Sequence, residues 1–329
     1  MGTITPWPVR RRRDSVAGEM AGAFENRLRK NARHRRKWAK AQALTAYRVY
    51  DRDLPDYPFV VEWYEGRAHV VEYPRRGRED AEARAAVLEA VAAVLEVPLM
   101  RVFTKTHLPK PWGREQYGKA GAGGERFTVQ EQGLKFWVNL GDFLDTGLFL
   151  DHRRTRAMVR DESAGKRFLN LFGYTGSFSV YAAEGKAAST TTVDLSNTYC
   201  EWAEANLELN GFGGAKNQVV RSDVVRWLRQ EAQRKGTYDL VVLDPPSFSA
   251  SKKMEGSFNV QRDHPRLLSE VGALLAEGGV LYFSTNYQGF ELDEASLEGW
   301  QGEELTPASI PEDFHQRDVH RCWRMTLVG

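Results

Sequence analysis

Short apolar runs alternate with amphipathic stretches throughout the second half of the chain. Near-continuous apolar segments predict strands over residues 167–172, 189–193, 218–221, 239–243 and 280–284. Between them, apolar positions at helical spacing predict helices over residues 178–184, 198–210, 225–234 and 265–276. Such alternation is typical of a parallel sheet covered by helices on both faces. Two further segments, 304–309 and 322–328, would close this sheet as strands.

The preceding part of the chain has a different pattern. Segments rich in valine and aromatic residues predict short strands over residues 45–50, 59–64, 68–73 and 100–104. Residues 80–96 predict a helix, and residues 127–130 and 135–140 predict a hairpin after a loop rich in Lys, Pro and Gly at 105–124. We therefore expect a small α+β domain over residues 45–143, followed by a larger α/β domain over residues 144–329.

The first 44 residues form a third region, a basic arm and helix. Residues 1–18 lack periodicity, which predicts a mobile arm. Met20, Phe24, Leu28 and Ala32 then recur every four residues, as on one narrow face of a helix. From Arg10 to Lys40 there are twelve Lys or Arg residues against three acids, although the whole chain has a net charge of only +2. This asymmetry indicates either an anionic partner such as nucleic acid or simply a solvated helix face.

Composition narrows the class of protein. The chain has 329 residues and 42% hydrophobic content, which suits a globular protein with a substantial core. It lacks an apolar run of about 18 residues, so we expect no membrane association. Its two cysteines, Cys200 and Cys322, fit a reduced, cytoplasmic protein and offer no zinc-binding spacing, so we expect no metal.

Candidate chemistry collects where the predicted parallel strands end, the edge at which doubly wound sheets bind ligands. The first strand runs into a turn with Gly173 and Gly176, which would let backbone approach a ligand. The second strand ends at Asp194, the third is followed by Asp223, and the fourth ends at Asp244. A single aspartate in such a place is often only a helix cap. Three at successive strand ends indicate a binding site.

These features resemble the class I S-adenosylmethionine-dependent methyltransferases. The resemblance implies a Rossmann-like fold with a mostly parallel seven-stranded sheet, S-adenosyl-L-methionine as methyl donor and S-adenosyl-L-homocysteine as product. Asp194 matches the acid that binds ribose, and Asp223 the acid on the adenine side. The cofactor-binding residues that we expect are Asp151, Arg153, Asn170, Phe172, Gly173, Tyr174, Thr175, Gly176, Ser177, Asp194, Leu195, Ser196, Asn210, Asp223 and Asp244.

The loop after the fourth strand, "DPPS", is similar to the loop of methyltransferases that act on nucleic-acid bases. Its prolines cannot continue a strand, and they hold the backbone in one shape beside a flat base. An aromatic ring next to it could stack on that base, which is worth about 1–3 kcal/mol. We expect the catalytic, base-holding residues to be Asp244, Pro245, Pro246, Ser247, Phe248 and Asn286.

Longer stretches, including "LDTGLFLDHR", "NLFGYTGSFSVYAA", "YDLVVLDPPSFSASKKM", "FNVQRDH" and "HRCWRM", resemble the RlmK-type methyltransferases. These bacterial enzymes form N7-methylguanosine in large-subunit (23S) ribosomal RNA. The resemblance runs from about Glu25 onward and implies large-subunit ribosomal RNA as partner. Many such enzymes are fused behind a second methyltransferase with an RNA-binding THUMP domain. We therefore expect a homodimer or pairing with a separate THUMP-bearing protein. Arg153 would meet the methionine carboxylate of the donor.

The cysteines bear on which atom is methylated. Related enzymes that methylate cytosine C5 attack the ring with a cysteine just after the fifth strand, where this chain reads "YFSTNY". Cys200 falls in a predicted helix and Cys322 in the last strand, so cytosine C5 is disfavoured. Guanine N7 has a free lone pair and needs no base, so positioning can suffice. Methylation of another base position, such as an exocyclic amine, and a non-catalytic RNA-binding assembly factor remain alternatives.

Overall fold

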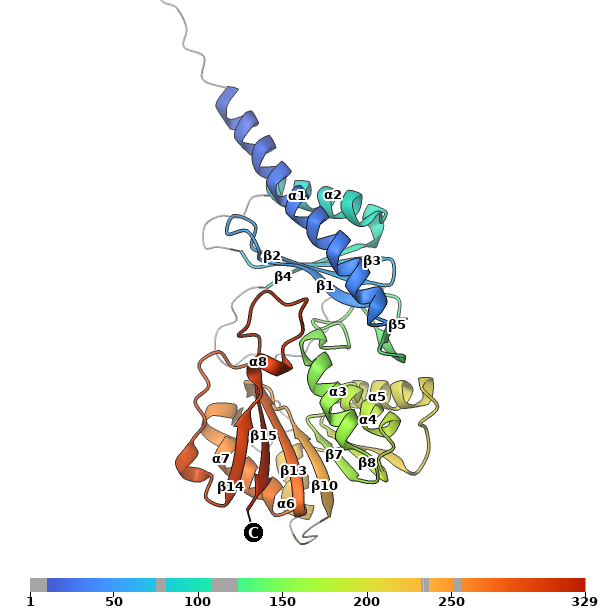
Figure 1. Cartoon of the computed structure of the whole chain (residues 1–329), viewed down its shortest axis with the longest axis vertical. Coiled ribbons are helices and arrows are strands. Elements are labelled where there is room, and N and C mark those ends of the chain that lie inside the picture. Colours follow the sequence, from blue (N-terminus) through green and yellow to red (C-terminus); the bar gives the residue numbers. More distant parts are fainter. Residues whose placement is uncertain are drawn as a thin grey trace, which may run out of the picture. The chain divides into compact units, whose positions relative to one another are not determined.

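A computed structural model describes residues 11–74, 81–107, 124–231, 233, 237–250 and 256–328 (Figure 1). The chain divides into two compact units, Met1–Leu108 and Pro109–Gly329. This division falls earlier than the boundary that we expected between residues 143 and 144. Of the expected mobile arm, residues 1–10 lie outside the described part of the chain, as do residues 108–123 of the expected loop.

The first unit is a four-stranded sheet in the order β1-β2-β3-β4. Strands β1 (Ala46–Asp51), β2 (Phe59–Tyr64) and β3 (Arg67–Glu72) are antiparallel neighbours. Helix α2 (Ala81–Leu95) and a short 3-10 turn, η1 (Leu99–Arg101), lead to β4 (Val102–Thr106), which pairs parallel to β3. At the β2–β3 turn both Glu65 and Gly66 have positive φ, as in the type I′ turn that suits a two-residue hairpin.

Helix α1 (Arg11–Ala41) begins earlier than the Met20 start that its apolar spacing predicted. The narrow apolar face is confirmed for the described side chains. Phe24 and Leu28 are 1% and 0% exposed, and the Phe24 ring lies 5.0 Å from that of Tyr50. Among the described side chains of α1, the lysines and arginines lie on the remaining faces, and most of them are exposed. The helix therefore covers the core of the first unit while presenting its cations to solvent.

The second unit contains the predicted seven-stranded sheet, in the order β14-β15-β13-β10-β7-β8-β9. Its five parallel strands are β7 (Arg167–Leu171), β8 (Ser189–Asp194), β9 (Asn217–Arg221), β10 (Tyr238–Leu243) and β13 (Leu275–Thr285). Strands β14 (Trp300–Glu304) and β15 (Arg321–Leu327) are antiparallel additions at one edge. The mostly parallel α/β architecture is thus confirmed.

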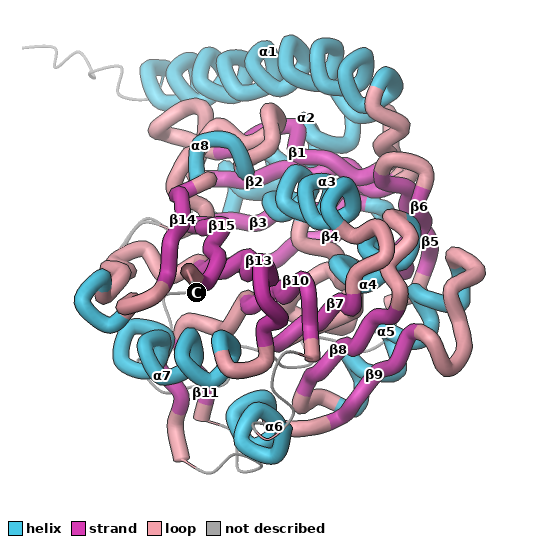
Figure 2. The backbone as a smooth tube through the Cα atoms, turned by 60° about the horizontal axis from the view of Figure 1, so that its bottom comes forward, coloured by secondary structure: helices cyan, strands magenta, loops and turns pink. Residues whose placement is uncertain are grey.

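Helices cover both faces of this sheet, as Figure 2 shows. Apolar residues of α6 (Val224–Glu231) and α7 (Val260–Gly272) form one core with the sheet. Residues of α3 (Arg153–Glu162) and α4 (Ser177–Glu184) pack on the other face. Helix α5 (Asn197–Leu209) follows β8 and contacts β8 and β9. The strands end at one common edge, which therefore lies between two layers of helices.

Two elements near the end of the chain differ from the pattern-based prediction. The segment 306–309, expected as part of a strand, is the short helix α8 (Thr306–Ser309), because Pro307 cannot donate to a strand ladder but suits a first helical turn. Helix α7 begins before Pro265 rather than at it. Pro265 has no N–H for the Gln261 carbonyl, and the His264 ring lies 3.0 Å from that oxygen as a substitute donor.

The predicted hairpin, β5 (Phe127–Glu131) and β6 (Leu134–Val138), belongs to the second unit rather than to the small domain. Side chains of α5 and of the residue after it hold the hairpin there: Asn206 accepts a hydrogen bond from the Trp137 N–H at 2.9 Å, and Asn210 accepts one from the Lys135 N–H at 2.8 Å. The Trp202 indole donates to the Trp137 carbonyl at 3.0 Å. The hairpin is therefore fastened by side chains far along the sequence, which its own pattern does not show.

Candidate active site

The sheet reverses its strand order between β7 and β10. β7 pairs with β8 on one side and with β10 on the other, and each is parallel to it. Successive crossovers lead away from this point in opposite directions, which leaves a crevice beyond the carboxyl ends of the strands. The short two-stranded ladder β11 (Phe248–Ser249) and β12 (Phe258–Asn259) lies just after β10 in the chain. The predicted site residues are expected to lie along this crevice.

The glycine turn after β7 is sharply bent, and its glycines are required by packing. Phe172, Tyr174 and Gly176 all have positive φ. A Cβ on Gly173 would lie 2.3 Å from the Thr192 Cγ2, and one on Gly176 would lie 2.8 Å from the Cβ of Ala203. Side chains at these positions would therefore displace β8 or α5. The turn ends where α4 begins, at Ser177.

Asp194, the last residue of β8, is bound to this turn. Its Oδ2 accepts a hydrogen bond from the Tyr174 N–H at 2.9 Å, and its Oδ1 accepts one from the Ser196 N–H at 2.8 Å. Burial raises the pKa of Asp194 to about 6, although backbone N–H donors that include Ser196, Tyr174 and Leu195 oppose the rise. Ser196 also caps α5. The structure thus brings the glycine turn, Asp194, Leu195 and Ser196 together.

Four other predicted cofactor residues have side chains that are committed elsewhere. Asn170 is 1% exposed and donates to the Ser179 hydroxyl at 3.1 Å. Thr175 is fully buried and donates to the Gly147 carbonyl at 2.7 Å. The structure does not bring Asn210 to the crevice, because Asn210 follows the far end of α5 and binds Lys135. Asp223 accepts from the Arg226 N–H at 2.8 Å, which is the helix-cap role.

The structure also corrects the expected role of Arg153. This side chain is 2% exposed and lies within the protein rather than in the crevice. Its guanidinium donates to Glu131 at 3.1 Å and to Asp313 at 2.8 Å. Arg156, fully buried one turn along α3, lies 2.6 Å from the other Glu131 oxygen. Burial alone would lower the Arg153 pKa, but both carboxylates raise it above its ordinary value, so it stays a cation bound to internal acids.

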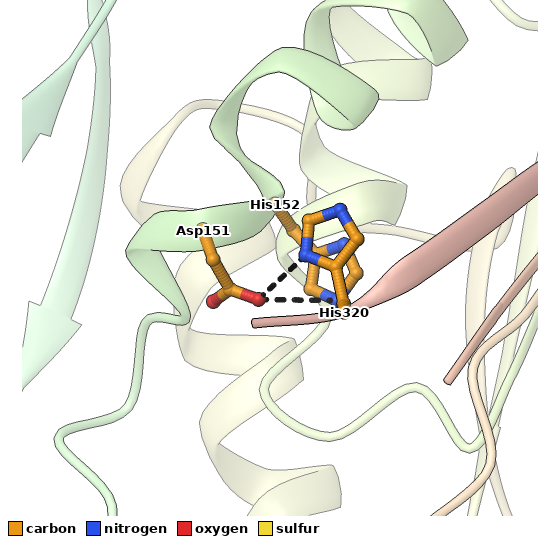
Figure 3. Close-up of side chains that lie close together, drawn as sticks. All are labelled: Asp151, His152 and His320. Carbon is orange, nitrogen blue, oxygen red and sulfur yellow. Dashed lines mark hydrogen bonds and ion pairs between the residues drawn. The ribbon is translucent and has the colours of Figure 1, made fainter. Parts of the chain in front are cut away.

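Asp151, His152 and His320 lie close together, as Figure 3 shows, and with Asp244 they form a network of carboxylates and imidazoles. His320 donates from Nδ1 to an Asp151 oxygen at 2.9 Å, and its ring stacks on that of His152 at 4.4 Å. The His152 Nε2 lies 3.7 Å from the same Asp151 oxygen and 3.4 Å from the Asp244 Oδ2. His152 is 5% exposed. Two aspartates predicted from the sequence are therefore linked by a histidine.

This network has the ligand types of a metal site but is already bonded internally. One oxygen of Asp151 and ring nitrogens of His152 and His320 lie within 4.8 Å of one another, and such donors suit zinc. Ser309 satisfies the second nitrogen of His320 at 2.8 Å. Burial lowers the pKa of His152, although Asp244 and Asp151 oppose the shift. A neutral His152 does not compensate the charge of Asp244.

The Asp-Pro-Pro-Ser loop lies beside this network. Ser284, in β13, donates to the Asp244 Oδ1 at 2.6 Å and so fixes the carboxylate at the head of the loop. Ser247 donates to the side-chain oxygen of Asn286 at 2.7 Å. Pro245 is buried and Pro246 is half-buried. The two residues expected to hold a base from separate strand ends are therefore neighbours.

Phe248, also expected to contact the base, is half-buried next to Ser247. It begins β11 and pairs with Asn259 of β12. The Val260 N–H donates to the Ser247 carbonyl at 3.1 Å, which ties the loop to the first residue of α7. The loop is thus anchored at both ends by the sheet and by a helix.

Neither cysteine is placed for nucleophilic attack. Both are buried, Cys200 in α5 and Cys322 in β15. Burial raises the pKa of the Cys200 thiol to about 12 and raises that of Cys322 further. Since the thiolate is the reactive form, neither side chain has the character of a catalytic cysteine.

His320 and Ser284 were not predicted as site residues. His320 begins the segment "HRCWRM" and Ser284 lies in "YFSTNY", but neither segment alone shows which residues these side chains contact. Their roles depend on β15 and β13 pairing antiparallel, which sets Thr285 opposite Arg321. That pairing brings His320 back to the edge where Asp151 and Asp244 lie.

Comparison with known proteins places the chain in a family. The model of the S-adenosylmethionine-dependent methyltransferase family matches residues 52–299. The chain is 48% identical to ribosomal RNA large subunit methyltransferase K of Neisseria meningitidis over 92% of its length and 86% of that protein. The chain belongs to the S-adenosylmethionine-dependent methyltransferases, in the same family as that methyltransferase K.

Longer relatives and a solved structure agree with this assignment. The chain is 48% identical to ribosomal RNA large subunit methyltransferase K/L of Hahella chejuensis, but it spans only 43% of that protein. The crystal structure of SMU.776, a methyltransferase in complex with SAH, matches with a TM-score of 0.78 and 26% identity. That match covers 93% of this chain and 81% of the other. No described helix is long and apolar enough to cross a membrane.

Proposed function

We propose that this protein transfers the methyl group of S-adenosylmethionine to N7 of a guanine in large-subunit ribosomal RNA. The observation that carries the proposal is the pairing of Ser247 with Asn286 beside Asp244, at the sheet edge that also holds Asp194. This arrangement occurs in a chain of the methyltransferase K family. It joins a donor side rich in carboxylates to an acceptor side of neutral hydrogen-bonding groups.

The donor side fits S-adenosylmethionine by its chemistry. Asp194 would accept hydrogen bonds from the ribose hydroxyls, because its carboxylate already lies against the glycine turn. When bound, S-adenosylmethionine supplies an electrophilic methyl group on a cationic sulfonium. Asp151 and Asp244, on either side of His152, place negative charge at the same edge, which would favour a cation there. Asp223 would stand on the adenine side while it caps α6.

The acceptor side fits a base that needs holding rather than deprotonation. Ser247 donates to the Asn286 carbonyl oxygen, which leaves the Asn286 amide group as a donor toward guanine O6. Phe248 would stack on the purine, and the two prolines would keep the loop rigid. N7 attacks through its own lone pair, so the residues contribute chiefly orientation and charge matching. The buried, protonated thiols argue against cytosine C5 chemistry.

The RNA partner accounts for the charge distribution of the chain. The exposed cations of α1 would contact phosphates. The K/L relatives are more than twice as long as the segment they share with this chain. A homodimer, or a separate protein with a THUMP domain, would supply further RNA contacts. We place the reaction in the cytoplasm, where ribosomes are assembled.

The experiment is nucleoside mapping of ribosomal RNA. RNA from a strain that lacks the gene should lose one N7-methylguanosine, and the purified protein with S-adenosylmethionine should restore it on that RNA. Ser247→Ala should restore it poorly, and Cys200→Ala should restore it fully. Restoration of 5-methylcytidine or of an N-methylated amine instead would refute guanine N7 as the acceptor. Absence of heat on mixing with S-adenosylmethionine would refute catalysis altogether.

A further inference from the structure

A hollow of about 110 Å³ opens between α6 and α7, on the sheet face opposite α3 and α4. Four arginines and two aspartates are among the ten residues that line it. The arginines are Arg226, Arg229, Arg262 and Arg266, and the aspartates are Asp223 and Asp263. The lining therefore has an excess of positive charge, although the whole chain is nearly neutral.

Helix geometry explains why four guanidinium groups meet there. Arg226 and Arg229 are three residues apart on α6, and Arg262 and Arg266 are four apart on α7, so each pair shares one helix face. Helix α6 follows β9, and the first residue of α7 donates to the Ser247 carbonyl in the loop after β10, so both helices begin near the carboxyl edge of the sheet. The two helices are in contact, as Figure 2 also indicates. Each arginine pair lies within the first two turns of its helix, next to the crevice.

This cluster of arginines contributes little to the stability of the fold. Arg262 pairs with Asp263 at 2.8 Å and Arg266 with Glu270 at 3.2 Å, and the two arginine side chains are 59% and 53% exposed. Exposed pairs of this kind contribute about 0–1 kcal/mol. Four cations around one hollow also repel each other. A ligand with negative charge would offset that repulsion, and stability alone does not account for the arrangement.

The position of the hollow indicates which ligand this is. Ser257 and Phe258 also line it, and Phe258 belongs to the β12 strand that pairs with β11. Phe248 of β11 directly follows the Asp-Pro-Pro-Ser loop. S-adenosylmethionine has no phosphate, so the donor cannot use these arginines as phosphate ligands. An RNA strand carries one phosphate per nucleotide, and arginine binds phosphate with two parallel hydrogen bonds.

We propose that the arginine-lined hollow between α6 and α7 binds backbone phosphates of the RNA strand that flanks the target guanine. This inference rests on the proposed function, since it assumes that RNA enters beside the Asp-Pro-Pro-Ser loop. It adds a contact site within the second unit, distinct from the basic helix α1. The hollow positions the strand, and the loop with Ser247 and Asn286 selects the base.

The test is a double variant with one change on each helix, Arg226→Gln with Arg266→Gln. A matched control removes two exposed cations at the opposite ends of the strands, Lys186→Gln with Lys216→Gln. Binding of a large-subunit ribosomal RNA fragment is measured at several salt concentrations. If each arginine neutralises one phosphate, the log–log salt slope becomes shallower by about 1.4 and affinity falls about tenfold at physiological salt. The lysine control should match wild type.

Further measurements keep this inference separate from the proposed function. Affinity for S-adenosylmethionine and the methylation rate at saturating RNA should stay unchanged, because Asp223 accepts from the backbone N–H of Arg226, which the substitution keeps. Arg226→Lys with Arg266→Lys should keep the salt slope and lose part of the affinity. Equal slopes for wild type and the glutamine variant would overturn the inference even if N7-methylguanosine forms. Tight binding of inorganic phosphate, abolished by the same variant, would also overturn it in favour of a small-anion site. Failure of wild type to methylate RNA would instead refute the proposed function.

Discussion

Asp194 links the donor side of the site to the stability of the fold, so Asp194→Asn can be tested by two independent measurements. We propose that its carboxylate binds both ribose hydroxyls. A hydrogen bond to a charged group contributes about 1.5–3 kcal/mol, and about 1.4 kcal/mol corresponds to tenfold in affinity. The amide keeps one acceptor oxygen but loses the charge. We therefore expect the S-adenosylmethionine affinity of the variant to fall by more than tenfold in calorimetry at pH 8.

The second measurement uses the pKa of Asp194, which burial raises from 3.8 to about 6. A carboxyl whose pKa is higher in the folded state stabilises the fold fully below pH 3.8, and that stabilisation is lost as pH rises through about 6. The full effect is about 3 kcal/mol, of which roughly half is lost between pH 5 and pH 8. Asparagine does not titrate. Relative to the variant, the wild type should therefore lose roughly 1 kcal/mol of unfolding free energy over that range.

The assay measures the free energy of urea unfolding of the full-length protein without S-adenosylmethionine. It compares wild type, Asp194→Asn and the control Asp161→Asn. Asp161 is a suitable control because its side chain is 69% exposed. It should follow wild type in both affinity and pH dependence. If the unfolding free energies of wild type and Asp194→Asn changed equally with pH, the Asp194 carboxylate would not be desolvated, contrary to what the structure implies. Unchanged donor affinity would show that Asp194 only holds the glycine turn.

Three further outcomes follow from the placement of other side chains. Cys200→Ala and Cys322→Ala should both keep methylation activity apart from packing losses, and loss of turnover with intact donor affinity would revive the cytosine C5 mechanism. Asn286→Ala should slow methylation at saturating donor by about tenfold or more, with unchanged calorimetry for S-adenosylmethionine, if it positions the base. Reversing four exposed cations of α1 should weaken RNA binding and make the log–log salt slope shallower by about 3, at about 0.7 per phosphate; equal slopes would place RNA contacts elsewhere. These four are Arg29, Lys30, Arg33 and Lys37.

Charge reversal is preferable to truncation because of how α1 packs. Phe24 and Leu28 are almost completely buried against the sheet of the first unit. Removing the helix would expose that core, and the resulting loss of stability could be mistaken for lost RNA contact. The exposed cations lie on the other faces, so their replacement leaves the core intact.

The sequence predicted those parts of the site that lie where the buried apolar strands end. Buried parallel strands end at a common edge, so Asp194, Asp244 and the glycine turn could be grouped without knowing any distance. The pairing of Ser247 with Asn286 was also within reach, since each follows a strand and β10 and β13 are neighbours. In each case a near-continuous apolar run located the polar residue that follows it.

Helix α3 could not be found in this way because most of its buried residues are polar, with Val159 as the exception. Arg153 and Arg156 point inward and are neutralised by Glu131, which arrives from the β5–β6 hairpin. A hydrophobic pattern gives little signal for such a helix, and the expectation that Arg153 would bind the donor came from the family resemblance. The pattern of the hairpin likewise does not show that Glu131 contacts α3, so the hairpin was assigned to the small domain. Only the three-dimensional structure shows that one glutamate forms ion pairs with both arginines.

In the second unit, the carboxylates of the sheet edge and the arginines of the hollow lie in different places, and each set suits a different ligand. Carboxylates at the sheet edge suit a cationic sulfonium and ribose hydroxyls, whereas the arginines of the hollow suit phosphates. Exchanging the two sets would repel both ligands, so the separation itself favours a cationic donor and a polyanionic acceptor. Counterion release accompanies phosphate binding but not binding of a small donor without phosphates. Raising salt should therefore weaken RNA binding steeply and S-adenosylmethionine binding only slightly, and similar slopes for the two ligands would contradict this division of the site.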